Sequence, residues 1–158
     1  MASVLILYYS RTGNTEKMAK LIEEGVAAGG VDVVSKPVQE VAPEELLEYD
    51  GVISGSPTYY GTMAWEIKKL LDDSVKFHGK LDGKVAGAFT SAANIGGGNE
   101  TTIMDMLAAW LIHGMIIQGD PQGDHYGRVS INAPDDRVEK QCRRFGERFA
   151  ALVKRVAG

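Results

Sequence analysis

Short apolar runs alternate along this chain with segments whose apolar residues recur at helical spacing, and this alternation constrains the fold most. The first run, Val4–Tyr9, is apolar without polar alternation, as expected of a strand covered on both faces. The segment that follows keeps the period of a helix at Met18, Leu21, Ile22 and Val26. The chain therefore begins with a strand, a turn and a helix.

The same unit is repeated to the end of the chain. Further strands are predicted over Val31–Val38, Gly51–Ser56, Val85–Thr90 and Met115–Gln118. Helices are predicted around Met63–Leu71 and Ile103–Leu111 and over Arg137–Val156, with a short helical turn at Pro43–Leu47. Strands that alternate with helices are joined by right-handed crossovers, which produce a parallel sheet with helices on both faces. We therefore expect one α/β domain over residues 1–158 with a five-stranded sheet.

The composition argues against several classes of function. The 158 residues carry a net charge of −4, which makes nucleic acid a poor partner. The longest apolar run is far shorter than the roughly 20 residues of a membrane span, and no leader-like segment opens the chain. One cysteine and three histidines argue against a Cys/His metal site. We expect a cytoplasmic protein without a metal, whose chemistry comes from a bound organic cofactor.

In an open, doubly wound sheet, ligands bind beyond the carboxyl ends of the strands, so the loops after the first, third and fourth strands are the candidates. The first loop, directly before a helix, consists of Ser10, Arg11, Thr12, Gly13, Asn14 and Thr15. Hydroxyl groups, a glycine and the N–H groups of a helix N-terminus can surround a phosphate. Neither a Walker loop nor G-x-G-x-x-G is present. Ser, Thr and Asn also cap helices, but a cap needs only one or two of them, so we favour a phosphate site.

The other two loops have the composition of a site for a flat ligand. Pro57 stiffens the exit from the third strand, and the adjacent Tyr59 and Tyr60 cannot both point into the core. Packing of these rings across the strand ends is an equal alternative to ligand contact. The fourth-strand loop, Ser91–Asn99, is uncharged and glycine-rich, so its backbone can approach a flat ring. A flexible connector, with Asn99 capping the next helix, is the alternative.

Taken together, these motifs resemble those of flavin proteins. The first loop resembles the [ST]-x-T-G-N-T phosphate loop of flavodoxins. The stretches Ser56–Gly61, Phe89–Ile103 and His113–Met115 resemble WrbA-type NAD(P)H:quinone oxidoreductases, and the likeness covers nearly the whole chain. The resemblance implies a flavodoxin-like three-layer sandwich of strand order 2-1-3-4-5, with FMN bound where the strand order reverses.

The same resemblance implies which residues form the site. The FMN phosphate is expected to contact Ser10, Arg11, Thr12, Gly13, Asn14 and Thr15. The flavin ring is expected between Pro57, Thr58, Tyr59, Tyr60 and Gly61 on one side and Ser91, Ala92, Ala93, Asn94, Gly96 and Gly97 on the other. His113 is implied near the ring as a catalytic residue, with a packed, hydrogen-bonded histidine as the alternative. The loop Asp124–Gly127 either closes over the ring or lies on the surface.

Two functions remain open. The resemblance implies an FMN enzyme that passes electrons from NAD(P)H to a quinone, or a flavodoxin that carries single electrons between protein redox partners. Flavodoxins place an aromatic ring and acidic groups in the fourth-strand loop; Ala92–Asn99 contains neither, which favours the enzyme. A receiver domain needs acidic residues where this chain has Ser10 and Ser56. A homo-oligomer is also considered, although the insertion that helps WrbA-type proteins form tetramers is missing between Val38 and Tyr49.

Overall fold

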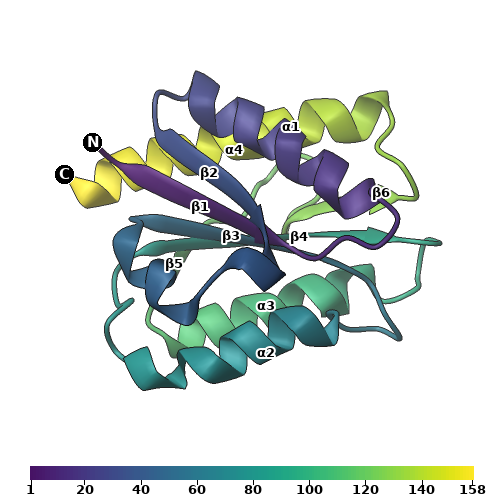
Figure 1. The fold of residues 1–158 in the computed structure, drawn as a ribbon. Coiled ribbons are helices and arrows are strands. Elements are labelled where there is room, and N and C mark those ends of the chain that lie inside the picture. Colours follow the sequence, from purple (N-terminus) through teal and green to yellow (C-terminus); the bar gives the residue numbers. More distant parts are fainter.

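A computed structural model describes residues 1–158 and shows one parallel β-sheet between two layers of helices (Figure 1). The strands are β1 (Ser3–Tyr8), β2 (Asp32–Pro37), β3 (Gly51–Pro57), β4 (Val85–Ala92), β5 (Ile116–Ile117) and β6 (Arg128–Ile131). Their order is β2-β1-β3-β4-β5, and β6 also pairs with β4. The predicted order 2-1-3-4-5 is therefore confirmed. The order reverses between β1 and β3.

Two helices cover each face of the sheet. In Figure 1, α1 (Asn14–Ala28) and α4 (Asp136–Ala157) lie above the sheet, and α2 (Trp65–Asp73) and α3 (Asn99–Ile112) lie below it. Short 3-10 helices span Val38–Glu40, Pro43–Glu48 and Ser74–Phe77. No helix of the structure is both long and apolar enough to cross a membrane.

The strands bury side chains on both faces, which explains their continuous apolar sequence. On β1, Leu5 and Leu7 belong to the apolar core between the sheet and helices α2 and α3. Val4 and Ile6 belong to the core between the sheet and helices α1 and α4. Because successive side chains of a strand point to opposite faces, a run without polar residues fills both cores at once. The sheet thereby becomes a rigid frame for the loops at its carboxyl end.

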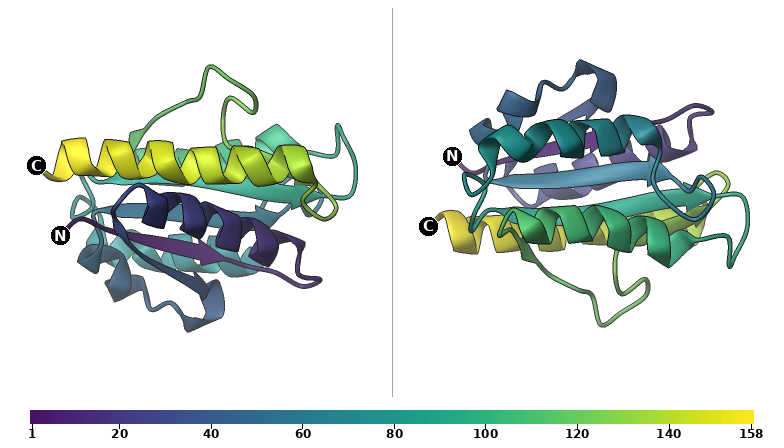
Figure 2. Two further views of the ribbon diagram at one scale, coloured as in Figure 1. Left: turned by 90° about the horizontal axis from the view of Figure 1, so that it is seen from above. Right: turned by 90° about the horizontal axis from the view of Figure 1, so that it is seen from below.

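The edge strand is split, which the sequence prediction missed. β5 pairs with the start of β4, and β6 pairs with residues Phe89–Ala92 at its end. Residues 118–127 form a loop between the two strands, and this loop projects from the sheet edge (Figure 2). Arg128 of β6 is only 1% exposed. A buried arginine breaks the apolar pattern by which a strand is recognised.

An ion cluster compensates for the buried arginine. The Asp120 carboxylate accepts hydrogen bonds from Arg128 and, at 3.1 Å, from Arg144. Burial by itself would raise the pKa of Asp120, but the hydrogen bonds from Arg144, a backbone N–H and Arg128 hold it well below its usual range. The cluster therefore ties the projecting loop to both β6 and α4.

Candidate functional site

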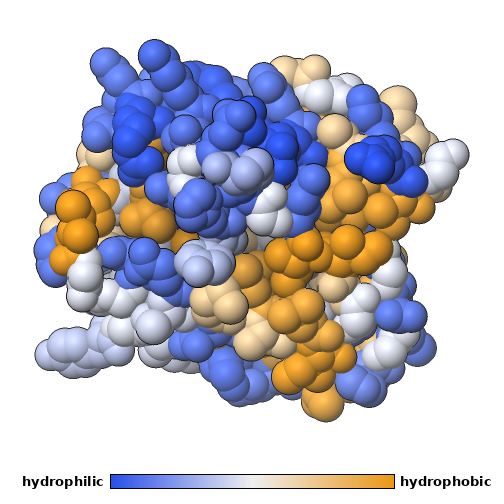
Figure 3. Space-filling model, turned by 180° about the vertical axis from the view of Figure 1, so that it is seen from behind, coloured by the Kyte–Doolittle hydropathy of each residue, from blue (hydrophilic) through white to orange (hydrophobic).

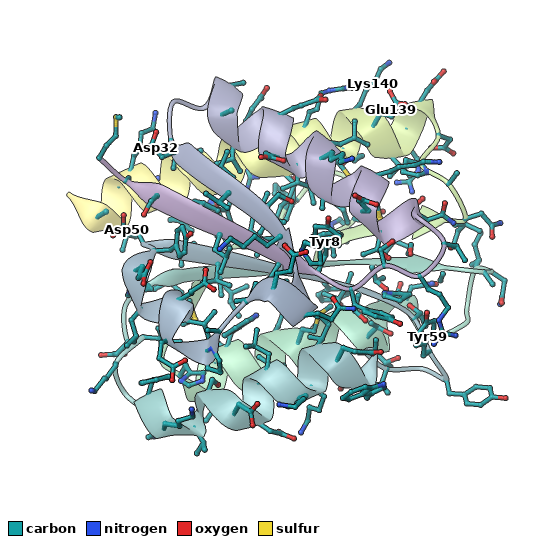
Figure 4. The ribbon with its side chains drawn as sticks, viewed as in Figure 1. Tyr8, Asp32, Asp50, Tyr59, Glu139 and Lys140 are labelled. Carbon is teal, nitrogen blue, oxygen red and sulfur yellow. The ribbon has the colours of Figure 1, made fainter.

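The loops after β1, β3 and β4 meet at one end of the sheet, because these strands are parallel neighbours (Figures 1 and 4). Hydrogen bonds connect them. The buried hydroxyls of Thr15 and Ser91 lie 2.8 Å apart and join the first loop to the end of β4. Thr58 donates its backbone N–H to the Ser91 carbonyl at 2.7 Å, and its hydroxyl lies 2.8 Å from that of Thr90. The three loops thus form one connected structure.

The first loop forms the N-terminus of α1. Gly13 adopts a φ of 101°, in the left-handed region that favours glycine. The Ser10 hydroxyl accepts hydrogen bonds from the N–H groups of Gly13 at 3.2 Å and Glu16 at 3.3 Å. The N–H groups of Asn14 and Thr15, in the first helical turn, have no carbonyl within the helix to bond. These two groups are available to a phosphate, whereas the side chain of Ser10 shapes the loop.

The predicted phosphate ligands therefore divide into two groups. The hydroxyls of Ser10 and Thr15 are engaged within the protein, while Thr12 and Arg11 are exposed. The Arg11 guanidinium lies 5.1 Å from the centre of the Tyr59 ring, which connects the first loop to the second.

The two tyrosines of the second loop have different environments. Tyr59 meets Tyr9 edge to face with 6.4 Å between ring centres. Burial raises the pKa of the Tyr59 phenol above its usual value. Tyr60 is fully exposed, with a φ of 46°. Of the two tyrosines, only Tyr59 therefore packs across the strand ends.

Glycines let the second and third loops approach each other. Gly98 is the N-cap of α3 and has a φ of 104°. A Cβ atom at Gly98 would overlap the Cα atom of Gly61. The Thr101 hydroxyl donates a 2.5 Å hydrogen bond to the Gly61 carbonyl. Only a residue without a side chain allows this contact, so the glycine run has a structural role.

Asn99 supports the third loop, a role that the sequence interpretation underrated. It is the first residue of α3 rather than its cap, and it is 5% exposed. Its side-chain oxygen accepts a hydrogen bond from the Gly96 N–H at 3.2 Å, and its amide donates to the Asn94 carbonyl at 3.5 Å. Asn99 therefore orders the third loop. Its position directly after three glycines is the signal that could have revealed this role.

A hollow of about 450 Å³ opens between the second and third loops. It is lined by Thr58, Tyr59, Tyr60, Ala92, Ala93, Asn94 and Gly97. All seven belong to the residues expected around the flavin ring. None of these seven residues carries a charge. A flat heterocycle with carbonyl and ring nitrogen acceptors suits such walls.

His113 does not lie near the hollow, contrary to the expectation that it is close to the flavin ring of its own chain. α3 begins at the third loop and runs for 14 residues, roughly 21 Å, before His113 caps its other end. There the Nε2 atom of His113 lies 2.8 Å from the Ser74 hydroxyl. His113 is a buried, hydrogen-bonded residue at the amino end of the sheet. This is the packed histidine that the sequence analysis gave as the alternative to a catalytic role.

The loop Asp124–Gly127 does not close over the hollow. Asp124 accepts a hydrogen bond from the Val129 N–H at 3.0 Å and pairs with Arg137 at 3.2 Å. These contacts hold it against β6 and α4, and none of its residues lines the hollow. The surface reading of this loop is the correct one.

The arrangement fits FMN. The space at Gly13 is open, with no atom within 4 Å of where a Cβ would lie, and unbonded N–H groups of α1 adjoin it. The uncharged hollow lies between the second and third loops, next to the first loop. FMN requires such neighbouring sites, because a short chain joins its ring to its phosphate. Residues of the first loop would hold the phosphate, and those of the second and third loops would hold the ring.

Comparison with known proteins agrees with this geometry. The flavodoxin family model matches residues 6–102. A flavodoxin of Clostridium saccharobutylicum is 39% identical over 97% of this chain and 98% of its own length. An NAD(P)H dehydrogenase (quinone) of Archaeoglobus fulgidus is 32% identical over 99% of this chain and all of its own length. The crystal structure of a WrbA-like flavodoxin from Agrobacterium tumefaciens shares the fold, with a TM-score of 0.83 at 24% identity and 99% coverage of both chains. The chain therefore belongs to the flavodoxin family of FMN-binding proteins.

Proposed function

We propose that this protein is a cytoplasmic FMN-dependent oxidoreductase that transfers electrons from NAD(P)H to quinones. The chemistry that FMN supplies when bound is the acceptance of a hydride and the release of two electrons. In the overall reaction, NAD(P)H and one proton reduce a quinone to its hydroquinone. The protein contributes binding, orientation and access for the two substrates.

The open rim of the hollow carries this proposal. Ala93, Asn94 and Gly97 line it and are exposed, and residues 92–98 include no aromatic or acidic side chain. A nicotinamide or a quinone can therefore approach a ring held there at stacking distance. Holding the two reactants in a near-attack geometry accounts for a large part of the rate enhancement of hydride transfer. The name of the Archaeoglobus relative supports the same activity.

A second candidate is a flavodoxin that carries single electrons between proteins. It is favoured by Tyr60, whose fully exposed ring at the rim offers an anchor to a protein partner. The name of the Clostridium relative supports this candidate. The two candidates differ in a measurable way, because only the enzyme oxidises NAD(P)H without a partner reductase.

Substitution at the rim tests the enzyme. Ala93→Trp should obstruct the hollow and lower NAD(P)H:benzoquinone turnover of the FMN-loaded protein at least about tenfold, while FMN affinity falls less. Ile95→Trp is the matched control, because Ile95 is 85% exposed and does not line the hollow. Its turnover should stay near that of the original protein. Equal effects of the two tryptophans, or turnover that Ala93→Trp leaves unchanged, would count against substrate access through this rim.

A further inference from the structure

We propose a second ligand site, separate from the FMN site, that takes a small quaternary ammonium cation. The site is a hollow of about 270 Å³ between α2 and the connection from β2 to β3. The short helices of this connection lie against α2 on the near side of Figure 1, away from the apolar surface that Figure 3 shows from behind. This hollow shares no lining residue with the one at the three loops.

One carboxylate in this hollow has no partner in the chain. Glu66 lines the hollow, is half-buried, and accepts no hydrogen bond from the rest of the protein. Its Oε2 atom is buried, so contact with a ligand falls to Oε1, the oxygen that is not buried. Because a carboxylate shares its charge between its two oxygens, a cation at Oε1 compensates the whole group.

The other charges around the hollow are engaged elsewhere. Lys69 and Asp73, which also line it, pair with each other at 2.6 Å. Arg11 lies over the ring of Tyr59, 5.1 Å from its centre, and does not line the hollow. Glu66 is therefore the one charge of the lining that is left without a counter-charge, and it favours a cation as the ligand.

The rest of the lining argues against a metal ion and against a primary amine. Ca²⁺ and Mg²⁺ need several oxygen ligands, and the structure holds no group of three side chains that could bind a metal ion. Val38, Val41 and Leu70 give the hollow apolar walls. A primary ammonium group brings three N–H donors, and such walls leave those that do not reach Glu66 unsatisfied.

A quaternary ammonium ion matches these walls. Its charge lies beneath alkyl groups, so it presents an apolar surface and has no hydrogen-bond donor to satisfy. Trp65 also lines the hollow and is 68% exposed, so its indole is accessible to a ligand. The face of an indole attracts cations of this kind. The hollow is smaller than the roughly 300–1,000 Å³ of a pocket for a drug-sized ligand, so the cation is small.

The test is an NMR titration, at constant ionic strength, of the FMN-loaded protein labelled with ¹⁵N-tryptophan. Choline is the probe, and 3,3-dimethylbutan-1-ol, which has the same shape but a carbon in place of the charged nitrogen, is its control. Choline should shift the indole N–H signal of Trp65 saturably and bind at least about tenfold more tightly than the alcohol. The signal of Trp110, which is buried and donates to the Ser54 hydroxyl at 3.0 Å, should not move.

Two pairs of variants locate the site. Glu66→Gln should reduce the affinity for choline to that for the alcohol, whereas Glu100→Gln, at an exposed position in the first turn of α3, should leave it unchanged. Trp65→Leu should bind choline several-fold more weakly than Trp65→Phe, which keeps an aromatic face; the methyl signal of choline reports binding in these two variants. Equal affinity for choline and the alcohol, equal shifts of both tryptophan signals, or equal affinities within either pair of variants would overturn the proposal.

Discussion

At the scale of single residues, Thr12 provides the sharpest test of the phosphate site. Its side chain is exposed, whereas Ser10 and Thr15 use their hydroxyls within the protein. Thr12→Val should weaken FMN binding by about 1–3 kcal/mol, because a hydrogen bond to a charged acceptor is lost. Riboflavin, which has no phosphate, should lose much less, and Thr12→Ser should restore FMN binding. Equal losses for FMN and riboflavin in calorimetric titrations would mean that Thr12 shapes the loop only.

Asp120 is the residue on which the edge strand depends. Asp120→Asn leaves Arg128 buried without its anion and should lower the free energy of unfolding by about 3–5 kcal/mol, measured by urea denaturation. Asp73→Asn breaks an exposed pair with Lys69 and should cost less than about 1 kcal/mol. A similar small cost for both variants would contradict the structural role of the cluster.

The effect of Asp120 also has a predicted pH dependence. Its pKa is lowered in the folded protein, so the unfolded chain, near pKa 3.9, takes up the proton first as the pH falls. The stability difference between the original protein and Asp120→Asn should be constant above about pH 5 and should shrink below about pH 4. A difference that grows on acidification would have the wrong sign for this ion cluster.

At the scale of elements, the contact between the second and third loops can be tested at one glycine. Gly98→Ala introduces both a strained φ and an overlap with Gly61, so the loops must separate and FMN affinity should fall at least about tenfold. Gly79→Ala has a comparable φ of 84° with no atom near its Cβ. It isolates the backbone strain, roughly 1–2 kcal/mol of stability, and should leave FMN affinity unchanged. Loss of FMN affinity in both variants would refute the contact argument.

The elements differ in how far the sequence predicts them. β1 and α4 are recognised directly, because one is apolar throughout and the other has a strongly amphipathic pattern. β6 escaped recognition because its first residue is Arg128, whose charge is compensated by Asp120, eight positions earlier, and whose guanidinium also donates to the Asp124 carbonyl. Contacts of that kind form in the folded chain and leave no periodic pattern in the sequence.

At the scale of the whole molecule, topology explains why the residues around the hollow could be predicted to lie together. Parallel strands place their carboxyl ends on one side, so residues far apart in sequence, such as Tyr59 and Ala93, must meet there. His113 shows the limit of motif likeness. A short motif does not indicate at which end of the sheet its residues lie. Because α3 begins at the third loop and is 14 residues long, His113 lies at the opposite end of the sheet from the hollow.

Reduction of the bound flavin by nicotinamide alone tests the central claim most directly. The FMN-loaded protein is mixed anaerobically with NADH or NADPH while the flavin absorbance is followed, and a quinone is then added. The proposed oxidoreductase predicts that one of the two nucleotides bleaches the flavin bands without any partner protein. It also predicts that the quinone restores them, with one hydroquinone formed for each NAD(P)H consumed. Bands that neither nucleotide bleaches, but that a reduced partner protein does bleach, would contradict the enzyme and identify the protein as an electron carrier.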